Sequence, residues 1–227
     1  MQILVITTLV TLIREYITNL TVPGGTSIFM FLACGIIPFF MFRNIVTQLM
    51  GGIAGNLSLF FYKPVRPIHV FLARTLLEFC IYSVIFLSVM ILVGWFVGYD
   101  VFPRDFLAAF GCVILMVLSG FSIGVIFAII THFIEPLKIF LTYIITALYL
   151  LSCVVFPIWI IPTALLEYFL YNPMLHICES LKYYYFDSYP LVDGINLIYP
   201  VAFNIVMLFI GFWFYYYKRR ELVASRP

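Results

Sequence analysis

Charged residues are scarce in this sequence, which has 12 Lys and Arg and 10 Asp and Glu among its 227 residues. They make up 10% of the chain, whereas soluble domains average ~25%, and 65% of the residues are hydrophobic. So few charges cannot cover the outside of a protein in water, and we infer that most of its surface faces membrane lipid. The net charge of +2 is also too small for a nucleic-acid-binding domain, so no nucleic-acid partner is expected.

Motifs that hold cofactors are missing as well. No lysine follows a glycine, which excludes the G-x-x-x-x-G-K-[ST] phosphate loop, so any nucleotide that drives this protein is bound by another chain. His69, His132 and His176 lie far apart, and the five cysteines contain no C-x-x-C pair. We therefore expect neither a metal nor a cofactor on this chain.

Long intervals without charge predict the membrane spans, because each is long enough to hold the ~20 residues of a spanning helix. A further apolar run begins at Met1. The expected fold class is an all-α integral membrane protein, with a single transmembrane domain over residues 1–227. Its six predicted spans cover about 1–20, 27–49, 69–98, 104–132, 136–157 and 192–217.

The basic residues predict the orientation of the spans. Six spans place nine of the twelve Lys and Arg residues on the side that holds the carboxyl terminus. Because Lys and Arg prefer cytoplasmic loops, we expect that terminus to be cytoplasmic. Acidic and basic residues are missing from the middle of the spans, which disfavours an ion-coupled transporter. A channel former or a permease with an external energy source remains.

The segment 51–69 is the most informative loop on the predicted cytoplasmic side. Its glycines end the preceding helix, and a short, partly apolar element over about 53–66 follows, with Lys63 and Arg66 at its exit. Composition favours an interfacial helix on anionic lipid and leaves open a knob that docks into a cytoplasmic partner. Just beyond it, Arg74 and Glu78 share a helix face and are predicted to form a structural ion pair at the membrane edge.

The external stretch from Pro157 to Pro190 predicts a helical hairpin. Prolines and Asn172 break it into two short helices between about 158 and 186, each too short to cross a bilayer. We expect an apolar side on these helices and a polar side that carries Glu167, Glu179 and Lys182, as in a re-entrant or interfacial hairpin.

Aromatic residues gather in this hairpin and at the end of the last span. Trp159 and the neighbouring tyrosines fit the headgroup level of a membrane, as do Trp213 and Tyr215 to Tyr217. Stacking of these rings on sugars is the second interpretation.

Residues 120–124 spell G-x-S-x-G, the pattern of a serine nucleophile elbow. That motif needs a turn between a strand and a helix, whereas Ser122 lies inside an apolar span, and no histidine lies in the middle of a span. Close helix packing through Gly120 and Gly124 is the favoured interpretation. An intramembrane serine hydrolase is kept as the alternative from another class.

Several runs of the sequence are similar to those of one transporter family. They are FLACGIIPFFMF (31–42), GIAGNLSLFFYKPVRPIHVFLARTLLE (52–78), LLSCVVFPIWIIP (150–162) and YNPMLH (171–176). They resemble the inner-membrane permease of bacterial capsular polysaccharide ABC exporters, the KpsM type within the ABC-2 permeases. The likeness extends over essentially the whole chain.

This resemblance implies a homodimer of six-span subunits in the bacterial inner membrane, with cytoplasmic ABC ATPase subunits that bind ATP and Mg. The chain itself would be a transport subunit and not an enzyme. Its substrate would be a lipid-linked capsular polysaccharide, passed on to periplasmic co-polymerase and outer-membrane export proteins. A permease for O-antigen, teichoic acid or another lipid-linked glycan is the near alternative.

The resemblance also assigns residues. The element at 53–66 becomes a coupling helix, with Asn56, Leu59, Lys63 and Arg66 as the contacts to the ATPase. The hairpin becomes an external gate. The residues assigned to it are Pro157, Trp159, Pro162, Asn172, Pro173 and His176. Family members usually carry an amphipathic interface helix before the first span, and we expect this form, which starts almost inside that span, to lack it.

Overall fold

The computed structural model describes residues 28–61, 65–97 and 101–223, which form seven α-helices and two 3₁₀ helices and contain no strand. The predicted first span at 1–20 lies outside these residues. The helices, in chain order, are α2 (Ile28–Met50), η1 (Ala54–Phe61), α3 (Pro67–Val97), α4 (Phe106–Phe133), α5 (Leu137–Leu151), η2 (Ile158–Ile160), α6 (Thr163–Phe169), α7 (Pro173–Tyr185) and α8 (Ile198–Val223).

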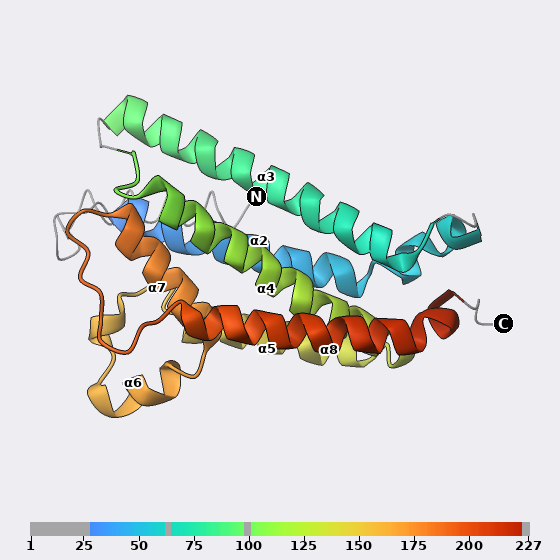
Figure 1. Ribbon diagram of the computed structural model, residues 1–227. Helices are drawn as coiled ribbons and strands as arrows, with labels where there is room; N and C mark the ends of the chain where they lie inside the picture. Colours follow the sequence, from blue (N-terminus) through green and yellow to red (C-terminus); the bar gives the residue numbers. More distant parts are fainter. Residues whose placement is uncertain (1–27, 62–64, 98–100, 224–227) are drawn as a thin grey trace.

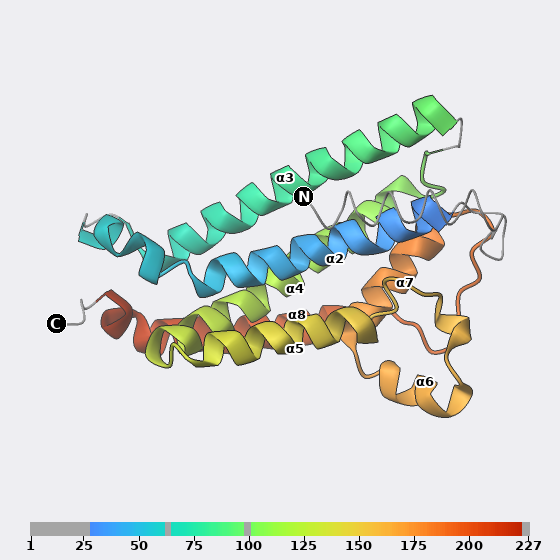
Figure 2. The ribbon, with the colours of Figure 1, turned by 180° about the vertical axis from the view of Figure 1, so that it is seen from behind.

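The long helices lie alongside one another, and the short ones sit at the two ends (Figures 1 and 2). We call the end with η1 and the last turn of α8 the η1 end, and the opposite end, with α6 and α7, the hairpin end. Four helices, α2, α3, α4 and α8, are long and apolar enough to cross a membrane. The predicted all-α class is therefore confirmed for the described residues, and these four helices are candidate membrane spans.

Helix α5 has 15 residues, which is ~22 Å at 1.5 Å per residue and less than a full bilayer core. It covers Leu137–Leu151 of the span predicted at 136–157. Cys153, just beyond it, has φ of 51°, a left-handed conformation that cannot continue a right-handed helix. The chain turns there into η2 and α6.

Helix α2 lies at the centre of the molecule, packed mainly against α4 and also against α3 and α7. Its close approach to α4 depends on two glycines of the G-x-S-x-G run. A Cβ on Gly120 would lie 3.1 Å from Ile45 Cβ, and one on Gly124 would lie 2.9 Å from Leu49 Cδ2. The predicted packing role of these glycines is confirmed.

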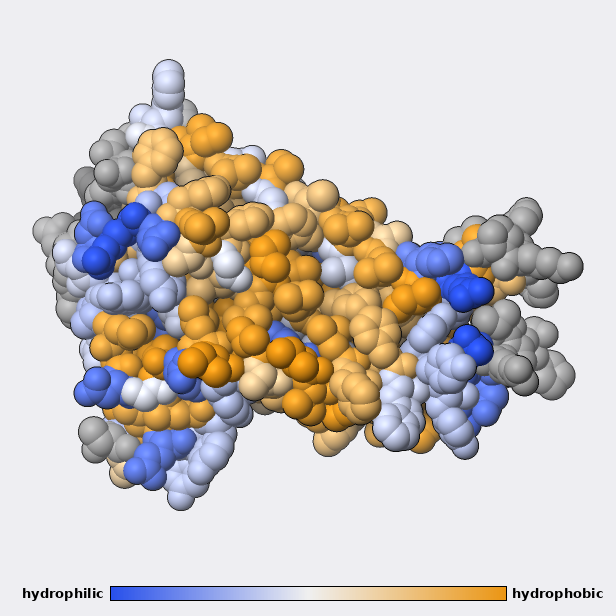
Figure 3. All heavy atoms as spheres, viewed as in Figure 1, coloured by the Kyte–Doolittle hydropathy of each residue, from blue (hydrophilic) through white to orange (hydrophobic). Residues whose placement is uncertain are grey.

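Helices α3 and α8 are covered much less than α2 by the rest of the chain, and both expose large apolar side chains. Figure 3 shows an apolar band across the middle of one face, between hydrophilic residues at the two ends. A band of this kind matches lipid as the surrounding solvent.

Candidate functional site

The element predicted to contact an ATPase is a 3₁₀ helix, η1, which is shorter than the helix expected over 53–66. Glycines open it, and the backbone N–H of Gly55 donates to the Gly51 carbonyl over 3.0 Å. Asn56 interrupts it with φ −130° and ψ 22°, and the Asn56 side-chain amide donates to the Gly52 carbonyl over 2.8 Å. Asn56 therefore fixes the turn between α2 and η1.

Exposure differs among the residues predicted to meet the ATPase. Asn56 is half-buried, whereas Arg66 is exposed and its backbone N–H donates to His69 Nδ1 over 3.3 Å. Lys63 and the side chain of Leu59 lie outside the described part of the structure. Phe60 is buried in the core and anchors the element, so Leu57 and Ser58 form its outer surface.

The predicted pair of Arg74 and Glu78 is not a direct contact. Arg74 instead donates to Gln48 Oε1 of α2 over 2.9 Å. Lys182–Glu179 and Lys218–Glu221, in contrast, are ion pairs shorter than 4.0 Å. The i, i+4 spacing could not predict this result, because the amide of Gln48 comes from another helix.

Prolines and a capped helix start shape the hairpin end. Pro157 immediately precedes η2, Pro162 immediately precedes α6, and Pro173 occupies the first turn of α7. The Asn172 side chain caps α7 by accepting from the Met174 N–H over 3.0 Å, and its amide donates to Ser152 Oγ over 2.9 Å. Each break predicted from the sequence at these residues therefore lies where a helix begins.

His176 and Trp159 connect the hairpin to the segment that leads into α8. The backbone N–H of Asn196 donates to His176 Nδ1 over 3.0 Å, so Nε2 carries the ring proton and donates to the Leu170 carbonyl over 2.8 Å. The ring of Trp159 lies 5.1 Å from that of Tyr189. Of the six predicted gate residues, Asn172 and His176 are therefore buried, and their hydrogen bonds connect parts of the hairpin end to one another.

The prediction that Glu179 and Lys182 lie on a polar, outward side of α7 is wrong. Glu179 and Lys182 are both buried, with exposed fractions of 1% and 0%, and they form an ion pair with Nζ to Oε1 of 2.8 Å. Their i, i+3 spacing also occurs on solvated helices, and the residues that cover them come from distant parts of the chain. The sequence therefore carried no local signal that this pair is internal.

A polar cluster inside the bundle explains Ser122. Asn204 of α8 donates to Ser119 Oγ of α4 over 2.9 Å. Ser122 Oγ donates to the Ser119 carbonyl over 3.1 Å and lies 3.5 Å from Asn204 Oδ1. These contacts join α4 to α8 and give Ser122 oxygen partners in place of the histidine base that a serine hydrolase needs. Asn204 was not singled out from the sequence.

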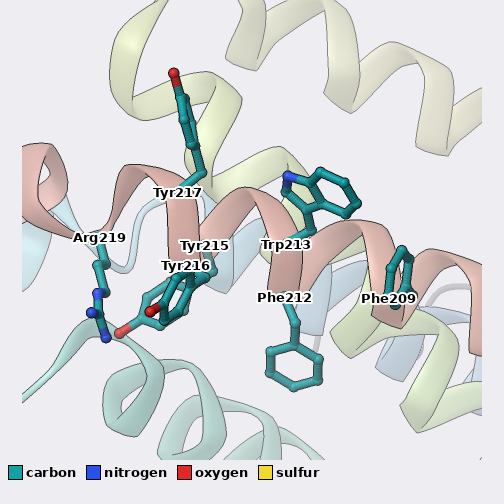
Figure 4. A pocket seen from close by; sticks show the side chains of 7 residues that line it. All are labelled: Phe209, Phe212, Trp213, Tyr215, Tyr216, Tyr217 and Arg219. Carbon is teal, nitrogen blue, oxygen red and sulfur yellow. The ribbon is translucent and has the colours of Figure 1, made fainter.

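Helix α8 carries a shallow aromatic groove near the η1 end (Figure 4). Phe212, Tyr216 and Arg219 follow one another at helical spacing, and the Arg219 guanidinium lies 4.2 Å from the centre of the Tyr216 ring. Apolar rings that lead to a basic residue at the end of a spanning helix fit the predicted position at a lipid headgroup.

Comparisons with known proteins identify a family of transporters and several relatives of this chain. The family model for ABC-2 type transporters matches residues 1–186. The polysialic acid transport protein KpsM of Escherichia coli is 33% identical over 210 residues, which are 92% of this chain and 80% of that protein. The capsule polysaccharide export inner-membrane protein CtrC of Neisseria meningitidis is 30% identical over 177 residues, 75% of this chain and 64% of that protein. BexB of Haemophilus influenzae, with the same description, is 26% identical over 175 residues, 75% of this chain and 64% of that protein.

Proposed function

The chain belongs to the ABC-2 type transporter family, and we propose that it is the permease subunit of an ATP-driven exporter of capsular polysaccharide across the bacterial inner membrane. The observation that carries this proposal is the similarity to KpsM, which extends over 92% of the chain. The relatives named as capsule export proteins of two further species support the same substrate class. A lipid-linked form of the polysaccharide is part of the proposal.

Hydrolysis of ATP belongs, in this proposal, to separate cytoplasmic subunits that bind ATP and Mg. The permease is not itself an enzyme and carries no cofactor. Two copies of it form the membrane path. The sequence has no phosphate loop, which supports the assignment of ATP hydrolysis to a separate subunit. The energy for a conformational change of the permease then comes from that second chain.

The six-span arrangement is also proposed, with α5 as a short fifth span and η2, α6 and α7 as a re-entrant hairpin on the outer side. The carboxyl terminus is then cytoplasmic. Lys138 and Lys218 support this orientation, because both lie at the η1 end: Lys138 Nζ is near Gly51, and Lys218 Nζ lies 5.2 Å from the Phe133 ring. The hairpin end then faces periplasmic and outer-membrane export proteins.

Helix α2 supplies the mechanical connection. It starts at the hairpin end, where it packs against α7, and it ends beside η1. Its 23 residues form one continuous helix, with Pro38 inside it, that is ~35 Å long. A partner that moves η1 therefore moves α2, and α2 in turn moves α7, the hairpin helix that packs against it.

Deletion of the gene in its own host tests the function. We expect surface polysaccharide to disappear and polysaccharide to accumulate inside the cell, with export restored by a plasmid copy. Purification of the tagged permease should also recover an ATPase that has a phosphate loop. Normal surface polysaccharide after deletion would contradict the proposal, and accumulation of a different lipid-linked glycan would reassign the substrate.

A further inference from the structure

The buried Lys182 ammonium contacts three separate parts of the chain. It donates to Glu179 Oε1 over 2.8 Å and to the Cys153 carbonyl over 2.7 Å, and it lies 4.1 Å from the centre of the Phe31 ring. These partners belong to α7, to the turn after α5 and to α2. One side chain therefore holds α7, the end of α5 and α2 together.

Both oxygens of the Glu179 carboxylate accept hydrogen bonds. Its second oxygen, Oε2, accepts from the Tyr189 hydroxyl over 2.7 Å. Burial, and then the negative charge of Glu179, raise the pKa of Tyr189, so this phenol stays a donor. A buried ion pair is seldom more stabilising than a well-packed apolar pair, so this network is better explained by what it positions than by stability alone.

The group positioned by Lys182 is a strained turn. Cys153 adopts φ of 51°, which a residue with a side chain rarely does. The next residue, Val154, lies directly on α2: a Cβ on Gly35 would be 2.6 Å from the Val154 carbonyl oxygen. The turn is thus pressed onto α2 through a glycine and held there by a hydrogen bond from Lys182.

We propose that Lys182, Glu179 and the Cys153–Val154 turn form a latch that holds the start of the hairpin against α2. In the closed state, which is the one observed, the Lys182–Cys153 hydrogen bond maintains the left-handed turn. In the open state this bond is broken, Cys153 relaxes to an ordinary conformation, and η2 and α6 move away from α2. The use of this latch in opening an outer gate rests on the proposed export function, whereas the latch itself does not.

Thiol labelling of the full-length chain in lipid nanodiscs tests the latch. Cys153 is buried in the closed state and serves as the reporter, and Cys112 of α4 is a buried reference in the same molecule. A Cys80→Ser background removes the exposed thiol. With Lys182→Met, we expect the rate of maleimide addition to Cys153 to rise at least tenfold while Cys112 stays protected, as read by peptide mass spectrometry.

Two further variants separate opening of the latch from general loosening. Lys182→Met with Glu179→Leu removes both charges, so no unpaired carboxylate is left buried. Gly35→Ala leaves the side chains of Lys182 and Glu179 unchanged, but its added methyl group would push Val154 away from α2. This variant should therefore also expose Cys153. Lys218→Met, from the partly exposed ion pair with Glu221, is the matched control and should change nothing.

Labelling needs neither ATPase nor glycan, so its result is independent of the export assay. Selective exposure of Cys153 in the double variant and in Gly35→Ala supports the latch. Protection of Cys153 equal to that of the parent in both variants would overturn it, as would equal labelling of Cys112 and Cys153 in the double variant. Normal surface polysaccharide after deletion of the gene would instead count against the proposed function, whatever the labelling of Cys153 shows.

Discussion

Asn204 of α8 donates its side-chain amide to the hydroxyl of Ser119 in α4, with 2.9 Å between nitrogen and oxygen. A second, longer contact of 3.3 Å runs from the same amide to the Leu115 carbonyl. Asn204 is 2% exposed, whereas most of α8 faces away from the protein. The helix is thus held to the bundle on one narrow face, with a polar clamp near its first turns.

Asn204→Leu should weaken the attachment of α8. Hydrogen bonds between membrane helices contribute ~0.6 kcal/mol on average and up to about 2 kcal/mol, and the variant also leaves Ser119 without a donor. We expect a loss in this range, measured as a lower midpoint of thermal unfolding in detergent. Ile205→Ala, at a neighbouring exposed position, is the control and should change the midpoint little.

Ser122→Ala separates packing from catalysis. The Ser122 hydroxyl donates within the bundle and is fully buried, so its loss should cost less than about 1.5 kcal/mol of stability and leave export of polysaccharide intact. Export is read from surface polysaccharide in a complemented deletion strain. Abolished function in a variant that still assembles in the membrane would favour the serine hydrolase interpretation.

Gly124→Ala should destabilise the contact between α2 and α4. The added methyl group would lie 2.9 Å from Leu49 Cδ2, and overpacking of this kind typically costs ~1–3 kcal/mol. Gly111→Ala in the same helix is the matched control, because nothing lies within 4 Å of its added Cβ. That change should be neutral or stabilising by up to ~1 kcal/mol through helix propensity. A smaller loss for Gly124→Ala than for Gly111→Ala would contradict the packing role.

The sequence predicted features that depend on local composition. The apolar intervals predicted the long helices, and Pro157, Pro162 and Asn172 marked the ends of the short ones, because proline and side-chain capping act within a few residues. The spacing of Gly120 and Gly124 predicted a packing face correctly.

Partners that are distant in the sequence could not be predicted in this way. Lys182 is buried because Phe31 and the Cys153 carbonyl cover it, and neither belongs to the local helix. Gln48 replaces Glu78 as the direct partner of Arg74 for the same reason. In both cases tertiary packing decided between a solvated charge and an internal one, and periodicity within one helix carries no information on that choice.

The predicted ATPase contact at η1 is tested by reversing one exposed charge. Arg66→Glu should reduce recovery of the ATPase subunit with the tagged permease at least fivefold, because Arg66 is exposed beside η1 and its positive charge would be attracted to an acidic partner surface. Asn56→Asp and Lys63→Glu added to it should abolish recovery. Lys138→Glu, another exposed basic residue at the η1 end, is the control. Equal recovery of the ATPase by the triple variant and by the parent would exclude the coupling role of this element.

The predicted level of the α8 aromatic groove in the membrane is tested by tryptophan fluorescence. Trp213 is 64% exposed on α8, whereas Trp95 lies near the hairpin end of α3 and is 83% exposed. In nanodiscs, a variant that retains only Trp213 should be quenched more strongly by nitroxide placed near the headgroup than by nitroxide at the end of the acyl chain, because indole rings concentrate at the interface. Replacing Trp213 by Phe in the same variant removes the last tryptophan and measures the background fluorescence. Stronger quenching from the bilayer centre would show that α8 continues beyond Trp213 within the hydrocarbon core, and would move Lys218 and Arg219 away from the boundary assigned to them.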